Sequence, residues 1–122
     1  MIKKPREIRF IMVLLVTFCG FISCEKYTYN PPTVDETKIW SLQDEIQPIF
    51  NSNCVSCHRG TIPPDLREGK SYNSLTSGGY VNLPAESSKL YTKITSSGHL
   101  ARSTEEEKLM VLYWITQGAK DN

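Results

Sequence analysis

The sequence lacks three features that characterise common kinds of small protein. No segment alternates apolar and polar residues as a half-buried strand does, so the patterns favour an all-α fold. No internal repeat is present. Basic residues are not in excess, with 14 Lys and Arg against 13 Asp and Glu, and we therefore expect no nucleic-acid partner. Beyond residue 24 the chain has only two cysteines, Cys54 and Cys57, and one methionine, Met110.

The first 23 residues have the pattern of a secretory signal peptide. Four basic residues within MIKKPREIR precede the apolar run FIMVLLVTFCGFIS, residues 10–23. This run is short for a membrane-spanning helix, which needs about 20 apolar residues. It ends at Ser23 and Cys24, a junction that resembles the lipobox of bacterial lipoproteins, in which the cysteine thiol receives a diacylglycerol. We expect export and a lipid anchor on Cys24, with an ordinary signal peptide or an uncleaved anchor as the alternatives.

The exported chain divides into a tether and one small domain. Removing residues 1–23 takes away four basic residues and one acidic residue, which leaves 10 basic and 12 acidic ones. Residues 24–38, with a proline pair and no periodicity, are interpreted as the lipidated cysteine and a flexible tether, or alternatively as an arm lying on the domain. Residues 39–122 are left for the fold. A core of this size is marginal, so we expect a metal, a disulfide or a cofactor to complete it.

A helix is predicted at the start of this domain. Ser41 and Asp44 have the spacing of a capping box, with Asp in place of the usual Glu or Gln. Pro48 lies within the apolar pattern and is expected to kink or end the helix. The residues of the apolar face recur at spacings of three and four: Ile39, Leu42, Ile46 and Ile49.

Three further helices are predicted, around 70–75, over 86–95 and over 104–117. The last begins with a capping-box pattern at Ser103 and Glu106 and ends before Gly118. Most of residues 59–88 is rich in Gly, Pro, Ser and Asn. A loop of this length in a compact domain is unusual and tends to be functional, so we expect something to organise it.

The segment IFNSNCVSCHRG, residues 49–60, places Cys54, Cys57 and His58 in the spacing C-x-x-C-H. A thioredoxin-like disulfide would need a βαβ setting, for which no strands are available. Zinc could use these residues with His99, but adjacent Cys57 and His58 reach one tetrahedral ion with difficulty. The third chemistry is c-type haem attachment, which the spacing signals directly. Each thiol then adds to a haem vinyl group, and His58 reaches the iron from the same side.

Four segments, IQPIFNSNCVSCHRG, PPDLREGKSYNSL, ESSKLYTKI and YWITQGAKDN, carry a resemblance that covers most of residues 42–122. They are similar to the small single-haem cytochrome c-like domains of exported bacterial lipoproteins. The resemblance implies an all-α fold of three to five helices around one covalently attached haem. It also implies that the first and last helices cross near the haem and pack through six apolar residues: Ile46, Ile49, Phe50, Val111, Trp114 and Ile115.

The sixth iron ligand is the open position. Such cytochromes usually supply a methionine in the loop before the last helix, and by similarity it would fall at about Leu100, which has no lone pair to give. His99 is the neighbouring candidate, because a neutral imidazole is a good iron ligand. The alternatives are an open or water-bound iron, or another donor such as a lysine or an exogenous molecule. Met110 is expected to pack in the last helix.

The resemblance also gives weaker expectations for other positions. A proline carbonyl, of Pro63 or Pro64, would accept a hydrogen bond from His58. Haem packing is expected from Leu66, Leu75 and Tyr91. Three further residues are conceivable partners of the haem propionates, with a surface or loop position as the favoured alternative for each: Tyr72, Asn82 and Arg102.

The function expected from these patterns is that of a membrane-tethered electron carrier, not an enzyme, with a redox protein as its unidentified partner. We expect it to be periplasmic or anchored to the outer membrane. The alternative is a five-coordinate haem domain that binds a small ligand or reduces peroxide, which is motivated by the absent methionine.

Overall fold

The computed structural model describes residues 28–122, so the predicted signal peptide and Cys24 lie outside the described residues. Residues 32–122 form one compact unit. Within the described residues the chain forms helices and no β-strand, which confirms the predicted all-α class. No helix in this part is both long enough and apolar enough to cross a bilayer. The elements in chain order are η1 (Leu42–Ile46), α2 (Gln47–Asn53), α3 (Ser71–Ser77), η2 (Ala85–Ser87), α4 (Lys89–Ile94), η3 (Leu100–Arg102) and α5 (Glu105–Thr116).

The first helical stretch starts as predicted but changes type along its length. Ser41 caps it by accepting a hydrogen bond from the backbone N–H of Asp44. The reciprocal bond comes from Glu45, whose carboxylate accepts from the Ser41 N–H at 2.8 Å, so Asp44 does not complete the capping box. η1 is a π-helical turn, and α2 follows it with Pro48 in its first turn. Pro48 does not end the helix; the change from π-helical to α-helical geometry comes directly before it, between Ile46 and Gln47.

The last helix, α5, begins one residue later than the predicted capping box. Thr104, not Ser103, is the N-cap, and its partner is Glu107 in place of Glu106. The Thr104 side chain accepts from the Glu107 N–H at 3.1 Å, and the Glu107 carboxylate accepts from the Thr104 N–H at 2.7 Å. The helix ends before Gly118, whose φ of +97° is open to glycine and disfavoured for other residues.

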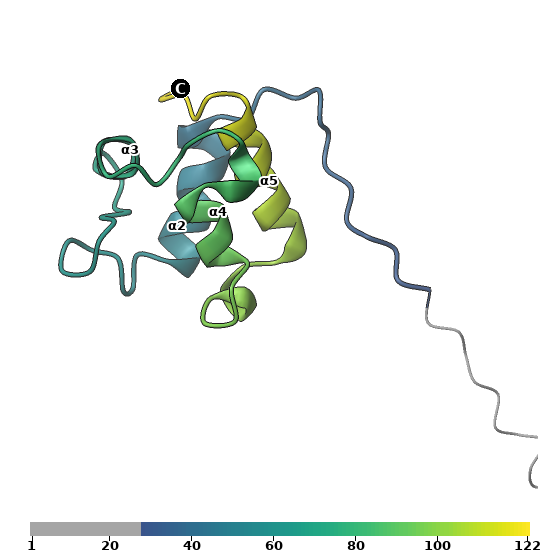
Figure 1. Ribbon diagram of the computed structural model, residues 1–122, viewed down its shortest axis with the longest axis horizontal. Helices are drawn as coiled ribbons and strands as arrows, with labels where there is room; N and C mark the ends of the chain where they lie inside the picture. Colours follow the sequence, from purple (N-terminus) through teal and green to yellow (C-terminus); the bar gives the residue numbers. More distant parts are fainter. Residues whose placement is uncertain (1–27) are drawn as a thin grey trace, which may run out of the picture. The chain divides into compact units, whose positions relative to one another are not determined.

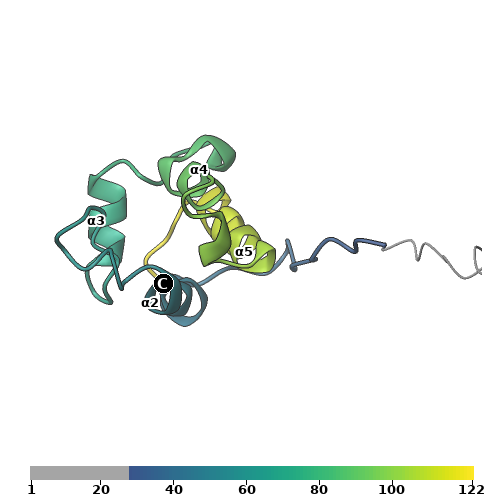
Figure 2. The same cartoon turned by 90° about the horizontal axis from the view of Figure 1, so that it is seen from below.

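The core lies where α2, α4 and α5 come together. Figures 1 and 2 show α3 on the side of α2 and α4 that faces away from α5. α5 contacts η1, η2 and α4. The predicted contact between the first and last helices is confirmed, since one buried cluster contains all six expected residues: Ile46, Ile49, Phe50, Val111, Trp114 and Ile115.

The two ends of the domain are hydrogen-bonded to each other. Gln117 accepts from the Trp40 N–H at 2.9 Å and donates to the Lys38 carbonyl at 2.8 Å. The Ser41 hydroxyl donates to the Asn122 carbonyl at 2.6 Å. Lys38 also pairs with Glu45 at 2.7 Å. The last residue of the predicted tether therefore lies on the domain.

We predict that Thr104→Ala lowers the free energy of unfolding by about 1 kcal/mol, because it removes the side chain that caps α5. Ser103→Ala is the matched control and should cost clearly less, since the Ser103 hydroxyl makes only a 3.4 Å contact with Asn53. Chemical denaturation of both variants measures the difference. Equal losses would mean that the capping box is not at Thr104.

Candidate functional site

The C-x-x-C-H residues lie on a tight turn that continues directly from α2. Cys54 is the C-cap residue of α2, and its carbonyl accepts from the N–H of Cys57 at 3.1 Å and of His58 at 2.9 Å. This turn brings both thiols and the imidazole to one cavity. The structure therefore joins three residues that the sequence predicted to act together.

This cavity has a volume of about 310 Å³ and lies between the C-x-x-C-H turn, the following loop, α4 and the segment before α5. It also receives His99, which comes from a different part of the chain. The lining residues are Asn53, Cys54, Cys57, His58, Pro63, Pro64, Leu66, Tyr80, Lys89, Leu90, Lys93, Ile94, Gly98, His99, Arg102 and Ser103.

His58 is oriented by the loop that follows it. Its Nδ1 lies 3.2 Å from the carbonyl oxygen of Ile62, so the expectation that Pro63 or Pro64 would be this acceptor was wrong by one residue. Gly60, with a φ of +102°, turns the chain back, and the Leu66 N–H closes the loop by donating to the His58 carbonyl at 2.9 Å. A hydrogen bond at Nδ1 leaves Nε2 as the nitrogen free to bind a metal.

His58 and His99 are close enough to share one metal ion. Their ring centroids lie 6.3 Å apart, with the ring planes inclined by 38°. A nitrogen–metal bond of about 2 Å, with about 1.1 Å from nitrogen to ring centroid, puts opposed imidazoles about 6.2 Å apart across one ion. The same bonds at a tetrahedral ion give about 5.1 Å. The observed centroid separation is closer to the first of these two distances than to the second.

The two cysteines are not joined to each other. Both are free thiols, with Cys57 exposed and Cys54 half-buried. Within residues 28–122 no three side chains of His, Cys, Asp or Glu are grouped as a metal site. The four-ligand zinc alternative is therefore not assembled in this part of the chain, and the thiols are available for another chemistry.

Burial raises the pKa of the Cys54 thiol to about 11, with a smaller contribution from the negative charge of Glu107 and a lowering one from Arg102. Such a thiol is protonated at neutral pH. A protonated thiol is a poor metal ligand and a poor nucleophile for disulfide exchange.

The apolar wall of the cavity differs in part from the expected one. Of the three residues predicted to pack on a haem, Leu66 lines the cavity, whereas Leu75 and Tyr91 do not. Leu90 and Ile94 take their place. They lie four residues apart on α4, and this helical spacing was the available signal for a shared face. Met110 packs against the core, as expected.

The polar rim of the cavity is basic. Of the three conceivable propionate partners, Arg102 lines the cavity, whereas Tyr72 and Asn82 do not. Lys89 and Lys93 were missed as rim residues, although their four-residue spacing places them on one side of α4. All three basic residues are exposed, so they are free to pair with anionic groups at the mouth of the cavity.

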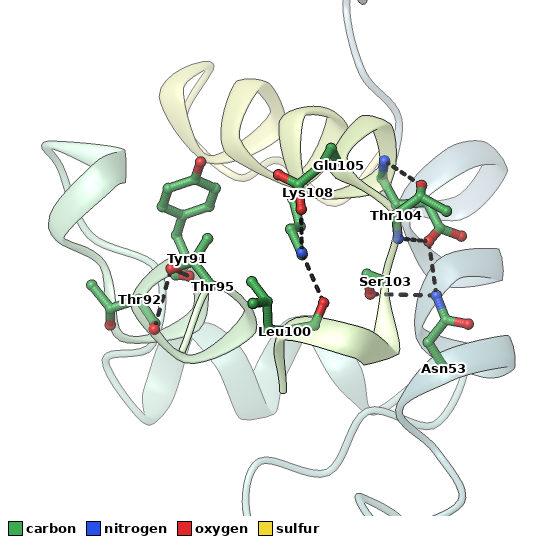
Figure 3. Close-up of polar contacts among 10 residues, drawn as sticks. Asn53, Tyr91, Thr92, Thr95, Leu100, Ser103, Thr104, Glu105 and Lys108 are labelled. Carbon is green, nitrogen blue, oxygen red and sulfur yellow. Dashed lines mark hydrogen bonds and ion pairs between the residues drawn. The ribbon is translucent and has the colours of Figure 1, made fainter. Parts of the chain in front are cut away.

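Both histidine-bearing segments are joined to the start of α5, as Figure 3 shows. On the His58 side, Asn53 donates to the carboxylate of Glu107 at 3.2 Å. On the His99 side, Lys108 donates to the carbonyl of Leu100 at 2.9 Å. One helical turn thus supports the two faces of the cavity.

Comparison with known proteins returned no match. No protein family, no curated protein and no solved structure is significantly similar to this chain. The chemistry of the cavity therefore has to be inferred from its own residues.

We predict that iodoacetamide alkylates Cys57 before Cys54 at about pH 8, near the ordinary pKa of a free thiol. A raised pKa leaves less Cys54 thiolate at this pH, and its rate should climb as the pH approaches 11. Mass spectrometry of the alkylated peptides gives the two rates. Denaturant is the control, since unfolding should equalise them. Equal rates without denaturant would contradict the burial of Cys54.

Proposed function

We propose that this protein is a membrane-tethered c-type cytochrome that carries single electrons through one covalently attached haem. The observation that supports it best is the 6.3 Å separation of the His58 and His99 ring centroids across a cavity that both cysteines line. The C-x-x-C-H turn supplies two thiols for covalent attachment and one imidazole, and His99 adds a second imidazole at the same cavity, which suits a haem with two histidine ligands.

Each group of residues has a distinct role in this proposal. Cys54 and Cys57 hold the haem through thioether bonds, and His58 binds the iron through Nε2 while Ile62 fixes the ring. Leu66, Leu90 and Ile94 keep water from the cavity wall. The haem, when bound, supplies the one-electron iron couple.

The side chain that serves as the second iron ligand determines whether the reduction potential is raised or lowered. A thioether ligand raises the potential of a haem relative to histidine. With His99 in the position where related cytochromes have methionine, this protein should work at lower potential than those cytochromes. A filled sixth position also disfavours the alternative function, small-ligand binding or peroxide reduction, which needs an open iron.

The N-terminal pattern supports attachment to a membrane, and the exposed residues of the cavity rim support contact with a redox partner. Lipidation of Cys24 would hold the domain at a membrane surface on the exported side. A redox protein would exchange electrons at the cavity mouth, because the side chains there are exposed.

We predict that the chain, expressed with cytochrome c maturation factors, gains the mass of one haem and gives a low-spin oxidised spectrum without a sulfur-to-iron charge-transfer band. His99→Ala should turn this spectrum high-spin and make the reduced protein bind carbon monoxide, because it removes one imidazole. Ser97→Ala is the matched control, since Ser97 is exposed and does not line the cavity.

Two results would overturn the proposed function. A chain that acquires no covalent haem would exclude a c-type cytochrome. A wild-type spectrum that is already high-spin would exclude ligation by His99 and support the ligand-binding alternative.

A further inference from the structure

Lys108 is a buried cation that the proposed electron carrier does not require. It lies in the first turn of α5 and is 2% exposed. Lysine is almost never buried to this extent unless its ammonium group is paired, because removing the charge from water is costly. The position of Lys108 therefore calls for a physical reason.

The ammonium group has two partners, both visible in Figure 3. Its Nζ donates to the Leu100 backbone carbonyl at 2.9 Å and to the Glu105 carboxylate at 2.6 Å. Glu105 is largely exposed, with 59% of its side-chain surface accessible, so water could replace much of that pair. The Leu100 carbonyl belongs to the residue directly after His99. The hydrogen bond from Lys108 to this carbonyl therefore reaches the side of the cavity that carries His99.

The segment that carries His99 has little else to hold it in place. η3 contains no buried residue, and Leu100 as a whole residue is 49% exposed. Its backbone hydrogen bonds are internal: Leu100 donates to Ser96 at 2.8 Å and Arg102 donates to His99 at 2.9 Å. Such bonds shape the turn but do not fix its distance from the rest of the domain.

We propose that Lys108 is a positioning residue that holds His99 opposite His58, an inference that rests on the proposed haem function. The anchor is one bond from a rigid helix to the carbonyl next to the ligand. While the bond is intact, the His99 ring stays within reach of the iron. Once it is lost, the turn is free to move outward and the sixth position opens.

This role gives Lys108 control over what the haem can do. With His99 held in place the iron has both histidines and is limited to electron transfer. With His99 released the iron can take a diatomic ligand. Lys108 would decide between these two states without contacting the haem or the diatomic ligand.

The experiment compares Lys108→Met with three other variants of the full chain loaded with haem. Lys108→Arg keeps a long cationic donor and should retain His99. Glu105→Gln keeps Lys108 on the Leu100 carbonyl and tests the ion pair alone. Lys120→Met is the charge-matched control, because Lys120 is exposed and does not line the cavity.

We predict that Lys108→Met raises the rate of carbon monoxide binding to the reduced protein roughly tenfold, the order of effect of one charge-assisted hydrogen bond. A high-spin fraction should appear in the oxidised spectrum. Amide hydrogen exchange over residues 96–102 should accelerate while that of α2 stays unchanged. Lys108→Arg should restore most of the wild-type behaviour, and Glu105→Gln and Lys120→Met should resemble the wild type.

A low-spin Lys108→Met protein with wild-type carbon monoxide kinetics and exchange would overturn the positioning role alone, provided that His99→Ala still turns high-spin. A wild type without haem, or one whose spectrum survives His99→Ala, would overturn the proposed function and this role together. If Lys108→Met does not accumulate as a folded protein, Lys108→Leu replaces it. Leucine is also apolar and has no donor for the Leu100 carbonyl, so loss of His99 supports the role and its retention overturns it.

Discussion

The geometry of the cavity depends on the first turn of α5. Glu107 in this turn caps the helix by accepting from the Thr104 N–H, and the same carboxylate accepts from Asn53, the residue before Cys54. Lys108, the next residue, reaches the carbonyl that follows His99. The segments that contain Asn53 and Leu100 lie more than 40 positions apart, and both are hydrogen-bonded to this one helical turn. The rigid start of α5 therefore fixes the position of each segment. A histidine pair on separate loops would otherwise have no fixed separation.

The small core explains why such a cavity is compatible with a stable fold. Trp114, Phe50 and Ile46 are almost completely buried and pack the first helical stretch against the last. The segment from Gly60 to Gly79, which includes α3, lies outside this contact and contributes mainly Leu66 and Leu75 to the core. A flat apolar group in the cavity, as we propose, would extend the core towards this loop and join it to α4.

The parts of this structure that could be predicted from the sequence are those with a local cause. The helix from 104 to 117 follows from apolar spacing and three consecutive glutamates, and C-x-x-C-H assigns Cys54, Cys57 and His58 within five residues. The predicted N-cap of α5 was wrong by one residue, because Ser103 and Thr104 both have a hydroxyl and both precede a glutamate by three positions. The proximity of His58 and His99 and the burial of Lys108 arise from tertiary contacts, for which periodicity carries no signal.

The hydrogen bonds between the two ends of the domain have a practical consequence for orientation. Trp40, Ser41 and the C-terminal Asn122 meet at the start of the first helical stretch, and the C-x-x-C-H turn follows its other end. The first helical stretch separates these two poles, and its α-helical part, α2, is by itself about 10 Å long. A C-terminal affinity tag leaves the cavity mouth unobstructed. The same tag used to immobilise the protein on an electrode would hold the cavity at the pole facing solution, where a soluble partner reaches it more readily than the electrode does.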